Sequence, residues 1–431
     1  MRKIIPSLLA AFSILFCCTN TFSQKPIVIK AGKLVNTEEG TISENVMILI
    51  TGDTIQAIGK NILVPDSAVV IDLSNSTVLP GLIDCHTHIT AQPGDNYYDD
   101  LFRKTPIDYA IVAHIYAKRT LLAGFTTVRD VGAAAFIDVA LKNAINHGDI
   151  DGPRMYVATL FIGSTGSHGD LNGFSPFINW EYPKGMSGVA NGVEGVREQV
   201  RYNIKYGADV IKFGASAGVL TEEESVGAPQ FSQEEMNAIV AEAKLWGRKA
   251  CAHAHGAEAI KMAVKAGVAS IEHGSFLDDE GIKLMLQNGT YLVADIYNDD
   301  YIRSDYARLG FPQKIIDKEK LVGQAQRDNF RKAVQAGVKI AFGTDAGVYP
   351  HGWNAKQFYY MVKYGQTPMQ AIQSATINAA DLIGVKNKLG SLKVGKFADI
   401  VAVKGDVLKD VTLLEHVSFV MKAGVVYKNE Q

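Results

Sequence analysis

Two histidines, His86 and His88, stand one residue apart at the end of an apolar run that begins at Leu82. On a strand, alternate side chains point to the same face, so the two imidazoles would lie on one side, about 7 Å apart at Cα. Imidazole nitrogens bind zinc at about 2.0–2.1 Å, and two of them at this spacing can reach one ion. On a helix the pair would be about 200° apart and could not chelate. The pair is therefore a candidate metal chelate.

Other candidate ligands also stand at or near the ends of apolar runs. Five of the ten histidines lie at such ends, where chance would scatter them along the chain. Besides the first pair, the candidates are Lys212 in the run 208–213, His253 and His255 in 249–255, His273 in 270–274, and Asp345 after 339–343.

These runs belong to a repeating pattern of strands and helices between residues 80 and 385. Strand candidates at 82–88, 126–131, 154–159, 208–213, 249–255, 270–274, 291–296 and 339–345 alternate with segments of helical period. One such helix has a capping box, with Ser232 at its start and Glu235 three residues later. Eight such units predict an α/β fold, a (β/α)₈ TIM barrel, whose chemistry lies at the carboxyl ends of the strands.

The two ends of the mature chain share a different pattern. Residues 24–79 and 386–431 contain short β-type runs separated by turns. We expect them to pair into one small, discontinuous β-sandwich domain beside the barrel.

Residues 1–23 have the features of a secretory signal peptide. Arg2 and Lys3 precede an apolar run that ends at Cys18, and small residues at Thr21 and Ser23 place cleavage before Gln24. The apolar run is shorter than the roughly 20 residues that a membrane-spanning helix needs. A lipoprotein signal is the alternative, but large residues precede Cys17 and Cys18. We therefore expect a periplasmic or secreted protein without a membrane anchor.

The cysteines and the charges exclude several other classes of protein. Only Cys85 and Cys251 remain in the mature chain, each beside a candidate ligand, so we expect two buried thiols and no disulfide framework. The 43 basic and 45 acidic residues nearly balance, which argues against nucleic-acid or membrane-surface partners. The expected partner is a small molecule.

Five ordered motifs carry a resemblance to a known family. The sequence around 81–88 (GLIDCHTH), 210–213 (VIKF), 253–256 (HAHG), 271–274 (IEHG) and 343–347 (GTDAG) resembles the amidohydrolase superfamily. The similarity is greatest to its imidazolonepropionase-like branch, which includes prolidase-type dipeptidases, acting on Xaa-Pro or Xaa-Arg/Lys, and ochratoxinase-like amidohydrolases. Barrels of this branch often associate, which makes a homo-oligomer compatible with the resemblance.

The resemblance implies a centre of two divalent ions, usually zinc. His86, His88 and Asp345 would hold the more buried ion, His253 and His273 the other, and a carboxylated Lys212 would bridge them. Lys212 stands between Ile211 and Phe213, where loss of water favours the neutral amine. A neutral amine can take up CO₂ to form an anionic carbamate. The alternative is a lysine that reaches solvent at the strand end.

Two cations would lower the pKa of a bridging water, so that hydroxide forms at neutral pH. Asp345 would pass its proton to the leaving nitrogen, and the reaction would be hydrolysis of a C–N amide bond. The alternative for Asp345 is a ligand role only. His255, His168 and Tyr297 are the substrate-binding candidates; His255 remains an alternative to His253 as ligand, and His168 an exposed loop residue without function. The expected substrates are dipeptides or N-acyl amino acids.

Two rival functions stay open. A mononuclear cyclic-amide hydrolase or deaminase, like imidazolonepropionase, would use the same barrel, although such relatives typically lack the lysine of VIKF. A non-catalytic binding protein is the second rival, and retention of all six ligand positions argues against it. The identity of the metal and of the amide stays open.

Overall fold

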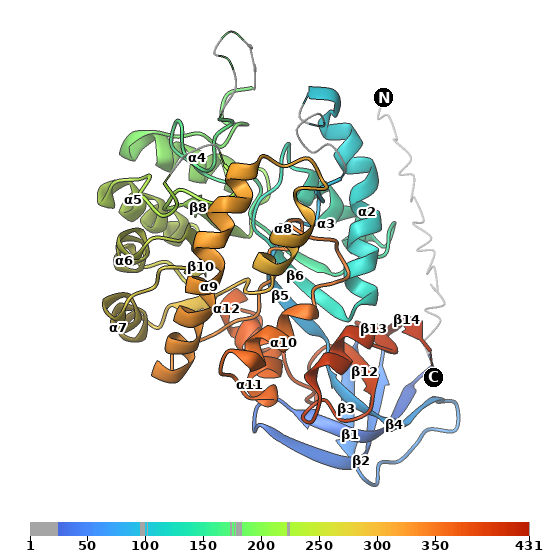
Figure 1. Ribbon diagram of the computed structural model, residues 1–431. Coiled ribbons are helices and arrows are strands. Elements are labelled where there is room, and N and C mark those ends of the chain that lie inside the picture. Colours follow the sequence, from blue (N-terminus) through green and yellow to red (C-terminus); the bar gives the residue numbers. More distant parts are fainter. Residues whose placement is uncertain are drawn as a thin grey trace, which may run out of the picture.

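The computed structural model describes residues 25–430 except 95–99, 101, 173, 174, 176, 178–182 and 222–224. The expected signal peptide, with Cys17 and Cys18, and the acidic run 222–224 lie outside the described residues. Figure 1 shows a barrel surrounded by helices and, below it, a smaller β structure that combines the blue and red ends of the chain. None of the helices in the described part of the chain has the length and apolarity needed to cross a membrane.

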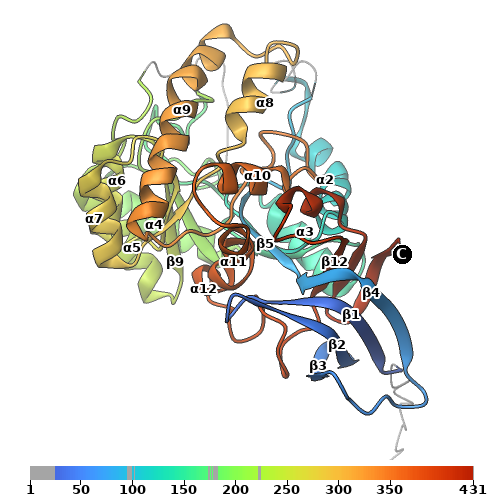
Figure 2. The same ribbon diagram turned by 60° about the horizontal axis from the view of Figure 1, so that its bottom comes forward.

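The two ends of the chain form one seven-stranded sheet, with the order β14-β13-β12-β4-β1-β2-β3. Edge strand β3 also bonds to the segment just before β12, through a bridge between Thr54 and Phe397, so the sheet folds over its own core (Figure 2). The strands are β1 (Ile27–Asn36), β2 (Thr41–Thr51), β3 (Thr54–Gly59), β4 (Val69–Pro80), β12 (Ile400–Lys404), β13 (Phe419–Lys422) and β14 (Val425–Asn429).

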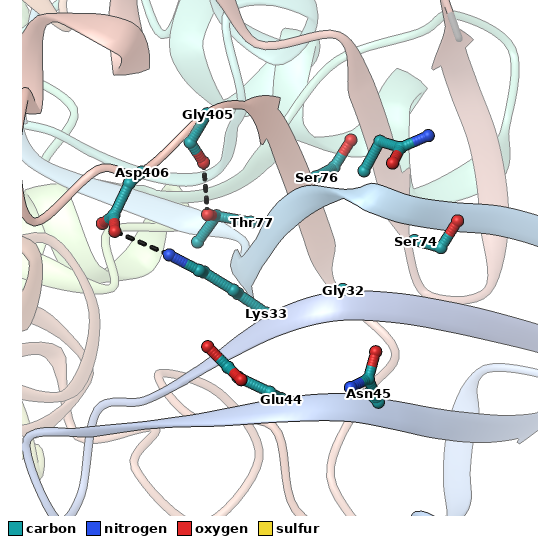
Figure 3. Close-up of a pocket in the computed structure, with 10 residues that line it drawn as sticks. Gly32, Lys33, Glu44, Asn45, Ser74, Ser76, Thr77, Gly405 and Asp406 are labelled. Atoms are coloured by element: carbon teal, nitrogen blue, oxygen red, sulfur yellow. Dashed lines mark hydrogen bonds and ion pairs between the residues drawn. The ribbon is translucent and has the colours of Figure 1, made fainter.

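A polar hollow opens on this sheet, between β1, β2 and the turn after β12 (Figure 3). Lys33 forms an ion pair with Asp406 at 2.6 Å, and Thr77 donates to the Gly405 carbonyl at 2.5 Å. None of the candidate ligands lines this hollow. Two of its charged groups, Lys33 and Asp406, satisfy one another.

The barrel contains the eight predicted strand positions in the predicted order. Seven are regular strands, and the eighth pairs only through isolated bridges, of Ile340 with Leu292 and of Ala346 with Thr87. The strands are β5 (Leu82–Thr87), β6 (Phe125–Asp130), β7 (Arg154–Val157), β8 (Val210–Gly214), β9 (Lys249–Ala254), β10 (Ser270–His273) and β11 (Tyr291–Val293).

Backbone hydrogen bonds complete the ring between these strands. The β5-β6-β7 and β8-β9-β10-β11 sheets are each parallel. Asp209 N donates to the Val157 carbonyl at 2.7 Å, which joins β7 to β8. Ile340 bridges to Leu292 of β11, and Cys85 N of β5 donates to the Phe342 carbonyl at 2.8 Å. The predicted TIM barrel is confirmed.

Helices surround the strands, and α5 begins at the predicted capping box of Ser232 and Glu235. Near the carboxyl ends of the strands, α8 and the long α9 lie side by side (Figures 1 and 2). The helices are α2 (Pro106–Leu122), α3 (Ile137–His147), α4 (Gly192–Lys205), α5 (Gln233–Leu245), α6 (Ala257–Ala266), α7 (Asp279–Asn288), α8 (Asn298–Asp305), α9 (Gln313–Ala336), α10 (Lys356–Lys363), α11 (Pro368–Gln373) and α12 (Ala379–Ile383), with a π turn at Ser374–Asn378 and a 3₁₀ turn at Val411–His416.

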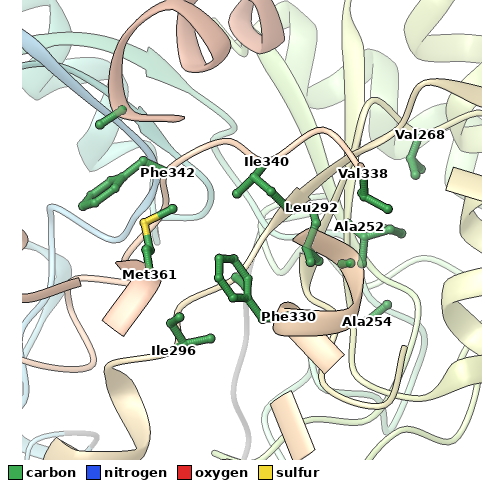
Figure 4. Packing of buried hydrophobic residues seen from close by; sticks show 14 of the residues in the cluster. Ala252, Ala254, Val268, Leu292, Ile296, Phe330, Val338, Ile340, Phe342 and Met361 are labelled. Carbon is green, nitrogen blue, oxygen red and sulfur yellow. The ribbon is translucent and has the colours of Figure 1, made fainter. Parts of the chain in front are cut away.

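The packing of β9 shows how the fold directs its histidines. Ala252 and Ala254 belong to the core between barrel and helices, where Phe330 of α9 packs near Leu292 and Ile340 (Figure 4). Because side chains alternate along a strand, His253 points the other way, into the barrel. Cys251, two residues earlier, is a buried free thiol, as is Cys85.

Candidate metal centre

The first three candidate ligands converge at the end of β5. His86 and His88 have ring centroids 5.5 Å apart, and the Nε2 atom of each lies 3.3 Å from Oδ1 of Asp345. The chain brings Asp345 to this place by backbone contact, since its N–H donates to the His86 carbonyl at 2.7 Å. The spacing of the histidines and the closure of the barrel thus place three ligand types around one point.

Asp345 and His273 have left-handed backbone conformations, with φ of 56° and 70°. Such φ values are uncommon for residues other than glycine and, when they occur, cluster at functional sites. Both residues turn their side chains inward at the point where the strand ends.

A second group of ligands adjoins the first. One nitrogen from each of His253, His255 and His273 lies within 4.8 Å of the others. The same distance limit holds for one nitrogen each of His86 and His273 and a carboxylate oxygen of Asp345. His273 is common to both groups. Burial, together with the neighbouring histidines, holds the pKa of His253 and of His255 well below the usual value, so both are neutral. Neutral imidazole is the form that binds metals.

Lys212 lies on β8 with only 1% of its surface exposed. Its neighbours Ile211 and Phe213 face the helix core, so the lysine points into the barrel. Its Nζ lies 5.6 Å from the Phe161 ring, and among the described residues it has no hydrogen bond or ion pair. The alternative of a lysine that reaches solvent is therefore wrong.

These residues fit a bound cation. Buried polar atoms normally have a partner, yet Nε2 of His253 is sealed from solvent and has no hydrogen-bond partner in the described structure. Imidazoles and a carboxylate are the donors that zinc and similar ions accept. The His/Asp group could therefore hold a metal.

A buried acid that the sequence did not single out contacts His86. Glu272 Oε2 lies 3.0 Å from Nδ1 of His86, and Arg129 donates to Oε1 of the same acid at 2.7 Å. Arg129 therefore pairs with Glu272, although Asp130 is its neighbour in the chain. Burial alone would raise the pKa of Glu272, but the Arg129 and His86 charges hold it below its usual value. Carboxylates at this place orient the imidazole of a metal site.

Asp295 plays the same part beside His273. Its Oδ1 lies 2.9 Å from Nδ1 of His273 and accepts from Gln326 at 2.8 Å, while Oδ2 accepts from Asn298 at 2.6 Å. Glu272 directly precedes a candidate ligand and Asp295 ends a predicted strand. These positions in the sequence could have identified both acids as groups near the metal ligands.

The three substrate-binding candidates occupy different surroundings. The His168 ring stacks on that of His253 at 4.1 Å, and burial lowers the pKa of His168 to about 3. His255 stacks on His273 at 4.8 Å, and its Nδ1 lies 2.7 Å from the Ser275 hydroxyl. Tyr297 lies instead in an aromatic cluster, with its ring 4.9 Å from that of Tyr349.

Comparisons with known proteins agree with this site. The model of the amidohydrolase family matches residues 77–428. Ochratoxinase from Aspergillus niger is 32% identical over 432 residues, covering 95% of this chain and 88% of that protein. A solved Xaa-Pro dipeptidase with bound methionine is similar with a TM-score of 0.87, 41% identity, and coverage of 94% of this chain and all of the other. A prolidase in complex with N-methylphosphonate-L-proline has a TM-score of 0.86, 32% identity, and coverage of 94% and 100%.

The chain belongs to the amidohydrolase family. It is a hydrolase that acts on C–N bonds. The resemblance to the branch of prolidase-type and ochratoxinase-like enzymes is confirmed by these relatives.

Proposed function

We propose that this chain is a binuclear metal-dependent amidase that cleaves a small dipeptide or an N-acyl amino acid, with a prolidase-like dipeptidase as the first candidate. The observation that carries the proposal is the pair of overlapping ligand groups that share His273. Lys212 lies within electrostatic range of both His86 and His253, as expected for a group between the two.

In this proposal His86, His88 and Asp345 would hold the more buried of two divalent ions, and His253 and His273 would hold the other.

 Lys212, as a carbamate, would supply the ligand common to both. His253 is the favoured ligand because its Nε2 is sealed from solvent and has no partner among the described residues. When bound, two zinc-type cations lower the pKa of a water and polarise the scissile carbonyl.

The chain's own residues orient the substrate and transfer the proton of the attacking water. Asp345 takes a proton from the attacking water at one carboxylate oxygen and delivers it to the leaving nitrogen. Asn298 Nδ2 lies 3.3 Å from Oδ2 of Asp345 and restrains this carboxylate. His168, neutral and stacked on His253, is placed to donate a hydrogen bond to the substrate.

The test is a library of dipeptides and N-acyl amino acids offered to protein supplied with zinc and bicarbonate. The proposal expects release of free amino acid and two ions per chain by elemental analysis. Turnover of proline-terminated dipeptides alone would support the prolidase-like candidate, and turnover of N-acyl aromatic amino acids the ochratoxinase-like one. A single ion per chain with a fully active Lys212→Ala variant would contradict the binuclear centre and favour the mononuclear alternative.

We also propose that the protein is exported. Residues 1–23 would be removed before Gln24, as the sequence pattern indicates. Amino-terminal sequencing of the protein from its native host tests this: a mature chain that begins at Gln24 supports export, and an intact amino terminus contradicts it.

A further inference from the structure

One face of α9 is turned toward the metal centre. Gln326 donates to Asp295 at 2.8 Å and to the carbonyl of the candidate ligand His273 at 3.3 Å. Glu319 and Gly323 precede Gln326 by seven and three residues, so all three share one side of the helix. At 1.5 Å per residue, Glu319 lies about 10 Å farther along the axis than Gln326.

Glu319 is buried without a partner. Only 4% of its surface is exposed, and it has no hydrogen bond or ion pair among the described residues. The adjacent Lys318 does not neutralise it, since its Nζ donates to the carbonyls of Gly218 and Thr221. A buried carboxylate without a partner is unfavourable unless a cation or a donor reaches it.

A second buried carboxylate lies beside it on α8. Asp299 is 2% exposed, and its Oδ1 is sealed without a hydrogen-bond partner in the described structure. Gly323 permits this approach, because a Cβ there would overlap the Asp299 carboxylate. The two acids are thus held close together at the contact between α8 and α9.

The local charge remains negative after two neighbouring arginines are counted, of which Arg303 contacts Asp299 at 3.4 Å. Arg327 pairs with Asp299 at 2.9 Å and with Asp300 at 2.8 Å, and its Nε donates to the Ile296 carbonyl at 3.0 Å. Burial, followed by the charges of Asp299 and Asp295, raises the pKa of Glu319 to about 8. A cation at this place would be stabilised by the same charges that disfavour the ionised acid.

We propose that Glu319 is a specificity-determining residue that binds a cationic nitrogen of the substrate, either an α-ammonium or the end of a cationic side chain. The proposal rests on the amidase function proposed above. Gln326, on the same side of α9, contacts Asp295 and the His273 carbonyl, so this side of the helix adjoins the centre, and a cation carried by the substrate can extend along it toward Glu319. Substrates without such a cation would bind less well.

The competing explanation is a proton shared between Glu319 and Asp299, with no role in binding. The variant Glu319→Gln distinguishes cation binding from a shared proton. Its amide has the shape of the protonated acid but cannot become a charged carboxylate, so it loses the cation site without a large change in packing. Asp317→Asn is the matched control, since Asp317 lies on the same helix and contacts only Lys320 and Gln313 among the described residues.

Two substrate pairs distinguish the sources of the cation. A free dipeptide is compared with its N-acetylated form, and a lysine-containing dipeptide with its norleucine counterpart. In the natural protein and in Asp317→Asn we expect a preference for the cationic member of at least one pair. In Glu319→Gln we expect kcat/KM for that member to fall about 30-fold, with the neutral member unchanged. No preference in the natural protein, or a preference that survives Glu319→Gln, would overturn the proposal.

Direct binding keeps this test separate from the proposed activity. Calorimetry compares L-lysine with L-norleucine, and L-alaninamide with N-acetyl-L-alaninamide, on metal-loaded protein. A preference for the cationic ligand that Glu319→Gln abolishes, in a protein that hydrolyses no amide, would support the cation site and reject the amidase. Hydrolysis without any cation preference would reject the cation site and leave the amidase standing. Melting curves establish that each variant is folded.

Discussion

The seven-stranded sheet and the mouth of the barrel differ in how their charged and polar groups are paired. In the sheet domain, Glu38 accepts from Ser391 at 2.7 Å, Lys393 at 3.2 Å and Lys396 at 3.3 Å. At the barrel mouth, His253 Nε2 and Asp299 Oδ1 are sealed without partners in the described structure, and Glu319 likewise has none there.

The difference separates polar groups that stabilise the fold from polar groups whose partner is a bound ligand. Satisfied pairs hold two segments together and require nothing more. Unsatisfied buried groups cost stability, and natural proteins retain them where a ligand supplies the missing partner. The comparison predicts that substitutions at the mouth reduce activity and metal content, whereas those in the sheet change only stability.

The largest effect is expected at the first ligand group. His86→Ala removes a ligand from the point where His88 and Asp345 meet, so activity should fall by about a thousandfold or more and bound metal should decrease. Steady-state kinetics and elemental analysis measure both. His147→Ala, an exposed histidine at the end of α3, is the control. Full activity of His86→Ala would show that this ligand group is not the metal centre.

The second-largest effect is expected for Lys212→Ala. Its activity should fall by about a hundredfold or more, and the bound metal should decrease from two ions per chain to one. The reason is that a short apolar side chain cannot form the bridging carbamate. Metal content per chain is measured alongside turnover, with circular dichroism to verify the fold. Two ions retained per chain in the variant would show that Lys212 does not bridge them.

Glu272→Gln should have an intermediate effect. The carboxylate that faces Nδ1 of His86 becomes a neutral amide, so metal affinity should fall about 10- to 100-fold. Competition with a chelator of known affinity measures the change. Glu242→Gln is the control, because that buried acid pairs with Arg201 on the outer helices. Unchanged metal affinity would mean that Glu272 serves the fold alone.

The smallest effect is expected in the sheet domain. The hydrogen bond from Ser391, with those from Lys393 and Lys396, lowers the pKa of Glu38 from 4.5 to about 2. A lowered pKa stabilises the folded state above the unfolded value, so this contribution is complete above about pH 4.5 and is lost as pH falls toward 2. Because Glu38 is largely exposed, the contribution is small.

Urea unfolding of Glu38→Gln and of the natural protein across this pH range measures the difference. The free energy of unfolding should differ above pH 4.5 and converge toward pH 2, while the rate of amide hydrolysis at neutral pH stays unchanged. A difference that does not depend on pH would show that the charge of Glu38 contributes nothing.

Much of this architecture was predictable because it depends on local patterns. The strand of His86 and His88 was visible from its apolar residues, and the capping box of Ser232 and Glu235 marked the start of α5. The barrel followed from the repetition of such units. The eighth strand was predicted at full length, yet it pairs only through isolated bridges, because the extent of strand pairing depends on neighbours that the segment itself does not specify.

The sequence by itself determined the residue types at the strand ends, because alternation along a strand decides which side chains point inward. It also determined the family, through five ordered motifs. Only the tertiary structure decided which acids support the ligands: Glu272 and Arg129 lie on different strands, and Asp295 meets Gln326 through the packing of α9. Between Lys318 and Lys320, Glu319 reads as a residue of a solvated helix face. Its burial arises from the approach of α8 at Gly323, and long-range packing of this kind has no local signature.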